Sequence, residues 1–96
     1  MNILNETKYK FIKEVLEVDN ISSIFISGWN SIYVISNDGY KKSFTTFKNI
    51  EEYLQFSSDI MEMLKINSLD YIVVDAIKIY VHKMDELNYW INLIKE

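Results

Sequence analysis

The sequence contains no cysteine, no proline and no arginine, and it has two glycines and one histidine, His82. The absence of cysteine excludes a disulfide framework, and one histidine leaves too few ligands for an ordinary zinc site. The two glycines, Gly28 and Gly39, are eleven positions apart, which excludes the glycine-rich loops that bind phosphates and dinucleotides. These absences favour a small folded domain that works by binding.

Because arginine is missing, all ten basic residues are lysines, against 14 acidic residues and a net charge of −4. Arginine makes most bidentate contacts to phosphates and base edges, and an acidic chain is repelled by a phosphate backbone. We therefore predict a protein partner that is basic or nucleic-acid-binding, and no direct specific contact with nucleic acid. One pattern points the other way: Tyr40, Phe44 and Phe47 interleave with lysines, as in surfaces that stack single-stranded nucleic acid.

A length of 96 residues predicts a single domain over residues 1–96. The hydrophobic fraction of 49% and the aromatic fraction of 15% are sufficient for one core. No leader segment is visible, and the longest apolar runs have about four residues, far below the roughly 20 of a spanning helix. We therefore expect a cytoplasmic protein with no membrane contact. Abundant isoleucine and asparagine without arginine or proline is typical of A/T-rich genomes, such as low-GC bacteria and their phages.

Hydrophobic periodicity predicts three helices and five strands. The helices are expected where apolar residues recur at helical spacing, over Glu6–Val18, Ile50–Ile66 and Glu86–Ile94. The strands are expected where apolar and polar residues alternate, over Ile21–Ser27, Ser31–Ser36, Tyr40–Thr46, Tyr71–Val74 and Ile77–His82. Three consecutive strands with short connections must pair antiparallel. The predicted fold class is therefore α+β, a single two-layer domain with helices packed on an antiparallel sheet of about five strands. Its element order is α-β-β-β-α-β-β-α.

Several residues mark the expected ends of these elements. Asn5, Asn49 and Asp85 are the predicted N-caps of the three helices, and Glu52 would complete a capping box with Asn49. The segment Asn37-Asp38-Gly39 predicts a hairpin turn of type I′, and a very tight turn is expected near Asp75-Ala76.

One stretch of the sequence resembles a known family. Ile21–Gly28, followed by Ser31–Val34, Gly39 and Phe47, is similar to the N-terminal domain of pilus-type secretion ATPases. The resemblance covers about a third of the chain and implies two strands, a turn and a third strand. The nucleotide-binding domain of those ATPases has no counterpart here. The resemblance therefore implies shared local architecture and no ATPase activity.

No residue pattern predicts a catalytic, cofactor or metal site. His82 follows Lys78 and Tyr80 on one face of an expected strand, and it is interpreted as a half-exposed strand residue rather than a general base. Two pairs of carboxylates lie one helical turn apart, as is common on solvated helix faces: Glu14 with Glu17, and Asp59 with Glu62. These pairs are interpreted as surface charge rather than as metal ligands.

The chain has more aromatic side chains than one core needs. Trp29 is expected in a turn, where a tryptophan has no core role. Tyr33 and Tyr40, with Phe25 and Tyr80, are expected on strand faces. Tryptophan and tyrosine are enriched at binding hot spots. Two interpretations remain open: the third helix covers these strand residues, or they form an interface.

We therefore predict a non-enzymatic protein-binding module. The expected role is a stoichiometric inhibitor, of the anti-CRISPR or another anti-defence type, which a phage or mobile element encodes and which occludes a basic nucleic-acid-binding or catalytic surface. Trp29, Tyr33 and Tyr40 would be the apolar anchors. The residues expected to supply charge complementarity are Glu14, Glu17, Glu51, Glu52, Asp59 and Glu62. Alternatives are an immunity or antitoxin protein that neutralises a toxin, a homo-oligomeric structural module such as a homodimer, and a small enzyme that uses His82 or a pair of carboxylates.

Overall fold

The computed structural model describes residues 3–43 and 45–96, which form two successive units of helix followed by three strands. The first unit begins with two short 3-10 helices, Ile3–Asn5 and Thr7–Tyr9, and continues with α1 (Lys10–Leu16), β1 (Ile21–Gly28), β2 (Ser31–Ser36) and β3 (Gly39–Lys42). The second unit comprises α2 (Ile50–Asn67), β4 (Ile72–Val74), β5 (Ile77–Asp85) and β6 (Asn88–Lys95).

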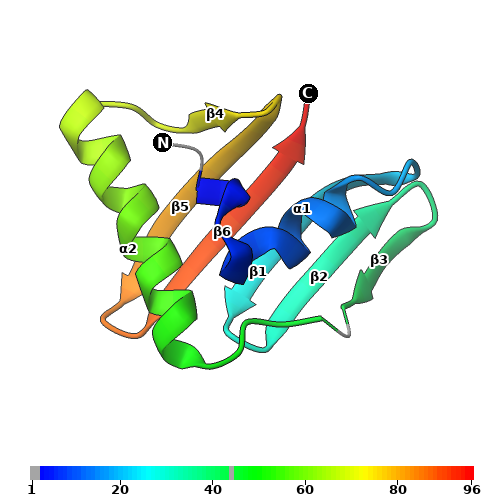
Figure 1. Ribbon diagram of the computed structural model, residues 1–96, viewed down its shortest axis with the longest axis horizontal. Helices are drawn as coiled ribbons and strands as arrows, with labels where there is room; N and C mark the ends of the chain where they lie inside the picture. The colour runs from blue at the N-terminus through cyan, green and yellow to red at the C-terminus, as the bar shows by residue number, and fades with distance from the viewer. Residues whose placement is uncertain (1–2, 44) are drawn as a thin grey trace.

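All six strands belong to one antiparallel sheet with the order β3-β2-β1-β6-β5-β4. Each unit is a three-stranded meander, and the pairing of β1 with β6 joins the two meanders at the centre of the sheet. Both helices lie on the same face of this sheet, α1 over β1 and β2, and α2 over β5 and β6 (Figure 1). The predicted α+β fold with two layers is therefore confirmed, with six strands in place of five.

The core lies between the sheet and the helices. Alternate residues of the strands point inward, and all of the following are buried: Ile24, Ile26, Ile32, Ile72, Ile77, Ile79, Val81, Tyr89, Ile91 and Leu93. Four buried aromatic rings fill the space under the helices: Tyr9, Phe47, Tyr53 and Phe56. The ring of Phe47 lies at the centre of this cluster, with centroid distances between 5.6 and 6.2 Å to the other three. Such tilted and edge-to-face contacts are the favourable geometry for aromatic pairs.

The hydroxyl group of Tyr53 joins α2 to the end of β6. It donates a hydrogen bond to the carbonyl oxygen of Tyr89 and accepts one from the backbone N–H of the same residue. Pairing between β1 and β6 extends only from Ile91 to Ile94, so Tyr89 lies beyond the reach of β1. The side chain of Tyr53 therefore satisfies backbone groups that would otherwise be buried without a partner.

The second helix forms as the sequence predicts. The side chain of Asn49 accepts a hydrogen bond from the backbone N–H of Glu52 at 3.0 Å, which confirms Asn49 as its N-cap. The carboxylate of Glu52 accepts a 3.4 Å bond from the backbone N–H of Lys48 rather than from that of Asn49, so the capping box is incomplete. The helix ends at Ser68, which has the left-handed conformation with a φ of 52°.

The first helix is shorter than the predicted Glu6–Val18, and the prediction of Asn5 as its N-cap was wrong. The α-helical part is limited to Lys10–Leu16, and the preceding residues form tighter 3-10 turns. Asn5 instead accepts a hydrogen bond from the ammonium group of Lys13 at 3.1 Å. The 3-10 turns bring Ile3, Leu4 and Tyr9 into the core, so burial of apolar side chains outweighs regular helix geometry here.

The predicted third helix, Glu86–Ile94, is wrong, because this segment is strand β6. Asp85 caps no helix. Its carboxylate accepts a hydrogen bond from the backbone N–H of Leu87 at 2.9 Å, within the two-residue turn between β5 and β6. The apolar residues of this segment fit a helical period and a strand period, because Tyr89, Ile91 and Leu93 also alternate along a strand. Pairing with β5 and β1 on either side decides in favour of the strand.

The turns also differ in type from the prediction. In the turn between β2 and β3 the residue with positive φ is Gly39, at 112°, while Asn37 and Asp38 have negative φ, so the turn is not of type I′. Instead, Asp75 and Ala76 have φ values of 51° and 62° between paired residues of β4 and β5, as type I′ requires. The third strand ends at Lys42 rather than at Thr46, and Phe44 lies outside the described residues.

Candidate protein-binding surfaces

One face of the sheet carries no helix, and we call it the outer face. Cross-strand partners define it in three rows: Tyr40, Ile35, Ser23, Ile94, Lys78 and Val73 in the first; Lys42, Tyr33, Phe25, Asn92 and Tyr80 in the second; Trp90 and His82 in the third. The helices lie on the opposite side (Figure 1). The assignment of Glu86–Ile94 as a helix would have covered these side chains, whereas strand β6 adds Trp90 and Ile94 to them.

Aromatic side chains pack in pairs along the outer face. The rings of Phe25 and Trp90 meet edge to face with centroids 5.9 Å apart, and those of Tyr33 and Tyr40 do so at 6.2 Å. These pairs leave much of their surface exposed, because Tyr40 is 78% and Trp90 43% accessible to solvent. A shallow groove of about 620 Å³ lies between them, lined by Phe25, Tyr33, Ile35, Gly39, Tyr40 and Asn92. The groove is apolar, with the amide of Asn92 as its only polar side chain apart from the tyrosine hydroxyls.

The helical layer has the opposite character, because α2 carries four carboxylates, Glu51, Glu52, Asp59 and Glu62, against the single lysine Lys65. Within residues 3–43 and 45–96, none of these four acids forms an ion pair with a lysine. Glu51 and Glu52 lie in the first turn of the helix, where a negative charge interacts favourably with the helix dipole. Part of this charge therefore stabilises α2 itself, and all of it lies at the surface of the helical layer.

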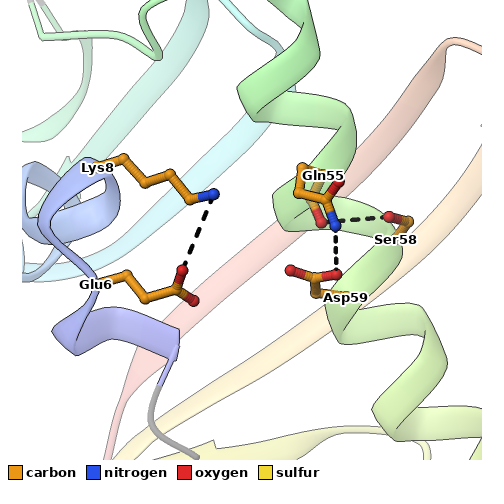
Figure 2. Close-up of polar contacts among 5 residues, drawn as sticks. All are labelled: Glu6, Lys8, Gln55, Ser58 and Asp59. Carbon is orange, nitrogen blue, oxygen red and sulfur yellow. Dashed lines mark hydrogen bonds and ion pairs between the residues drawn. The ribbon is translucent and has the colours of Figure 1, made fainter.

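Side chains from two elements meet beside the middle of α2 (Figure 2). The carboxylate of Asp59 accepts a hydrogen bond from the side-chain amide of Gln55 at 2.7 Å, and the hydroxyl of Ser58 donates to the carbonyl oxygen of Gln55. Glu6 and Lys8 extend from the N-terminal segment towards this group, and they form an ion pair at 3.9 Å. The charge of Lys8 is therefore matched by Glu6 within the N-terminal segment.

Below this group lies the hydroxyl of Tyr9, which is fully buried and has no hydrogen-bond partner among the described residues. Burial, and then the negative charges of Asp59, Glu6 and Glu52, raise the pKa of Tyr9 from 10.0 to about 12. Burial also raises the pKa of Tyr53, although its hydrogen bond to the backbone of Tyr89 acts in the opposite direction. Both side chains are therefore neutral over the physiological range.

The structure separates the predicted site residues into two groups. Tyr33 and Tyr40 are in contact on the outer face, and the six predicted acids belong to the helical layer: Glu14 on α1, Glu17 at the C-cap of α1, and the remaining four on α2. Trp29 belongs to neither group. It lies in the turn between β1 and β2, is 36% exposed, and its carbonyl oxygen accepts a bond from the backbone N–H of Phe47. One rigid partner surface cannot contact the acids and the two tyrosines together.

Sequence reasoning missed Trp90 as a surface residue, because the segment was assigned to the buried stripe of a helix. Alternation within Asn88–Lys95 would have placed Trp90 opposite Tyr89 and Ile91, and this signal was available. His82 is exposed on the outer face and pairs with Trp90 across the strands. In the part of the chain that the structure describes, no three acidic or histidine side chains are grouped as metal ligands would be. Nor does any described helix have the length and apolar character needed to cross a membrane.

Comparison with known proteins gives no relative: neither a protein-family model nor a curated protein sequence matches the chain. Function is therefore inferred from the outer face of the sheet and from the acidic surface of α2.

Proposed function

We propose that this chain is a non-enzymatic protein-binding domain whose helical layer docks onto a basic surface of another protein. The observation that carries the proposal is the acidic surface of α2, where the four carboxylates have no lysine partner within the part of the chain that the structure describes. Glu14 on α1 and Glu17 at its C-cap add two acidic residues to the same layer. Unpaired surface charge of one sign accelerates association with the opposite charge and disfavours wrong partners.

The proposed role is that of a stoichiometric inhibitor. A domain with net charge −4 that covers a basic nucleic-acid-binding or catalytic surface competes directly with the phosphate backbone for the same cations. Trp29 at the edge of the domain is the proposed apolar anchor, since it is exposed and held in place by the hydrogen bond of its carbonyl oxygen to Phe47. Anti-CRISPR and other anti-defence inhibitors of phages and mobile elements work in this way, in the cytoplasm of the bacterial host.

There are two alternatives. An immunity or antitoxin protein neutralises a basic partner by the same physics, and a toxin gene adjacent to this one distinguishes it from a phage inhibitor. A homo-oligomeric structural module would instead use the outer face, where Tyr40, Trp90 and Ile94 are exposed.

Affinity capture tests the proposal. The immobilised chain is exposed to lysate of a low-GC bacterium at low and at high salt, and the bound proteins are identified by mass spectrometry. We expect one dominant basic protein whose retention falls with salt, because the screening length shrinks from about 10 Å at 0.1 M to about 3 Å at 1 M. The partner is then measured with purified components, and its displacement by nucleic acid shows whether the two compete.

Two triple variants localise the contact, and each changes the net charge from −4 to −1 by removing three carboxylates. The test variant is Glu51→Gln, Asp59→Asn and Glu62→Gln on α2. The control variant is Asp19→Asn, Asp38→Asn and Glu86→Gln, which lie in turns. We expect the first to weaken binding at least tenfold more than the second. Equal losses would show that only net charge matters and would refute a docking site on α2.

A further inference from the structure

The outer face has the composition of a protein interface, with an uncharged centre and charges towards its edges. The two central strands, β1 and β6, present serine, asparagine, Phe25, Trp90 and Ile94 to solvent, and no charged side chain. The cations Lys42 and Lys78 belong to β3, at one edge of the sheet, and to β5, next to the other edge. An aromatic core with charge restricted to the rim is typical of protein–protein contacts.

The same distribution weighs against a nucleic acid as the occupant. A bound single strand needs a continuous row of cations along its phosphates in addition to aromatic side chains. Here only two lysines face outward, on opposite sides of an uncharged centre. Lys78 is in addition held over the ring of Tyr71, with its ammonium nitrogen 5.0 Å from the ring centroid.

The size of the face agrees with that of a standard interface. Seen along the shortest axis of the molecule, as in Figure 1, the whole backbone spans 36 by 26 Å, so a rectangle of roughly 900 Å² encloses it and sets the upper limit for the outer face. A stable complex buries about 800 Å² on each partner, so one partner of similar width is sufficient to cover the outer face. A second copy of this chain has that width. Its own uncharged centre would meet this one without opposing like charges.

We propose that the outer face packs against the outer face of a second copy, which gives a dimer with two-fold symmetry. The exposed ring of Trp90 and the apolar groove lined by Phe25 and Tyr33 are the surfaces that would pack together in this dimer. Sheets stacked in this way lie about 10 Å apart, with their side chains interleaved. The helical layers then face outward, so each dimer presents the acidic surface of α2 twice, in opposite directions.

Sedimentation equilibrium and light scattering over a dilution series test the proposal with the full chain. We expect the mass of two 11.4 kDa chains at micromolar concentration and dissociation on dilution. The test variant is Ile94→Glu, which places a carboxylate in the uncharged centre. Its cross-strand neighbour Lys78 offers it an attractive partner in the monomer, so the fold is expected to tolerate the change. This variant should be monomeric at concentrations where the wild type is a dimer.

The matched control is Ile66→Glu, which exposes the same new charge near the end of α2, where Ile66 is 73% exposed. It should dimerise as the wild type does. Circular dichroism checks that each variant is folded, and if Ile94→Glu unfolds, Tyr40→Glu replaces it, because Tyr40 is already 78% exposed. A wild type that is monomeric throughout, or a dimer that Ile94→Glu and Tyr40→Glu leave intact, would overturn the proposal.

Two further outcomes are decisive. If a single-stranded oligothymidylate quenches the tryptophan fluorescence of a monomeric wild type, and less so that of Ile94→Glu, the face belongs to a nucleic acid and the dimer proposal fails. Capture of a basic partner is a separate test, made with the α2 variants. If Ile94→Glu is monomeric and still captures the partner, while the α2 variants do not, both proposals are supported. A dimer that persists in Ile94→Glu refutes only the dimer, and α2 variants that still bind the partner refute only the docking surface on α2.

Discussion

The buried hydroxyl of Tyr9 gives the sharpest prediction for stability. The ring of Tyr9 packs in the core against those of Phe47 and Phe56, and its hydroxyl oxygen has no hydrogen-bond partner among the described residues. A buried polar group without a partner lowers stability by about 1 to 3 kcal/mol relative to its solvated state in the unfolded chain. The substitution Tyr9→Phe removes the oxygen and keeps the ring, so it should make the protein more stable.

The expected change in melting temperature follows from this free-energy range. If the free energy of unfolding rises by only about 1 kcal/mol, the melting temperature of a domain of this size rises by roughly 4 to 8 °C. Alkaline pH should enlarge the difference. Burial raises the pKa of Tyr9 from 10.0 to about 12 in the folded state, so between pH 10 and 12 the hydroxyl ionises only in the unfolded chain. The wild type therefore loses up to about 3 kcal/mol as pH rises through this window, at about 1.4 kcal/mol per pKa unit.

Urea denaturation at pH 7 and at several values between pH 9 and 11.5 measures both effects. The matched control is Tyr53→Phe, which removes the buried hydroxyl of Tyr53. This one satisfies two backbone groups of Tyr89, so its loss should lower stability by about 1 to 3 kcal/mol. The two substitutions are chemically identical and have opposite expected signs. If Tyr9→Phe is destabilising by as much as Tyr53→Phe, the hydroxyl of Tyr9 has a stabilising contact and the reasoning is refuted.

Two further predictions concern local geometry. Replacing Asn49 by alanine removes the side-chain hydrogen bond from the N–H of Glu52 and should lower the free energy of unfolding by about 1 kcal/mol, as measured by thermal denaturation. The control Asn49→Asp should preserve the stability. An unchanged melting temperature for the alanine variant would contradict the capping role. Ala76 has a φ of 62°, a left-handed conformation that is unfavourable for a residue with a Cβ by about 1 kcal/mol. Ala76→Gly should therefore raise the free energy of unfolding, and a loss of stability would show that the turn is not under strain.

Local signals in the sequence were sufficient for the hairpin of β1 and β2 and for α2. Strands β1 and β2 are bounded by turn residues and alternate regularly, and α2 has both an N-cap and a continuous apolar stripe. These features are decided within a few residues of chain, so they can be predicted without tertiary information. Strands β4 and β5 were located for the same reason, although β5 is three residues longer than predicted and extends to Asp85.

The last element needed information that is not local. Asn88–Lys95 satisfies a helical and a strand period at once, and its conformation is decided by neighbours far away in the sequence, β1 among them. The error also changed the candidate site, since a helix would have covered the aromatic residues that β6 leaves exposed. The predicted acids and tyrosines could be named from composition. That they lie on opposite sides of the sheet could not be predicted, because this depends on which face the helices cover.

The order β3-β2-β1-β6-β5-β4 also has a consequence for the folding reaction. Every strand pairing inside a meander closes a short loop, and such closures are fast and cost little chain entropy. The pairing of β1 with β6 is different, because it joins Ser23–Ile26 to Ile91–Ile94 across most of the chain. We therefore expect the two meanders to form early and this central seam to form late, as the slow step of folding. Until β1 pairs with β6, each of these strands exposes an unpaired edge. A second chain can then supply the missing strand, so that the two chains exchange meanders.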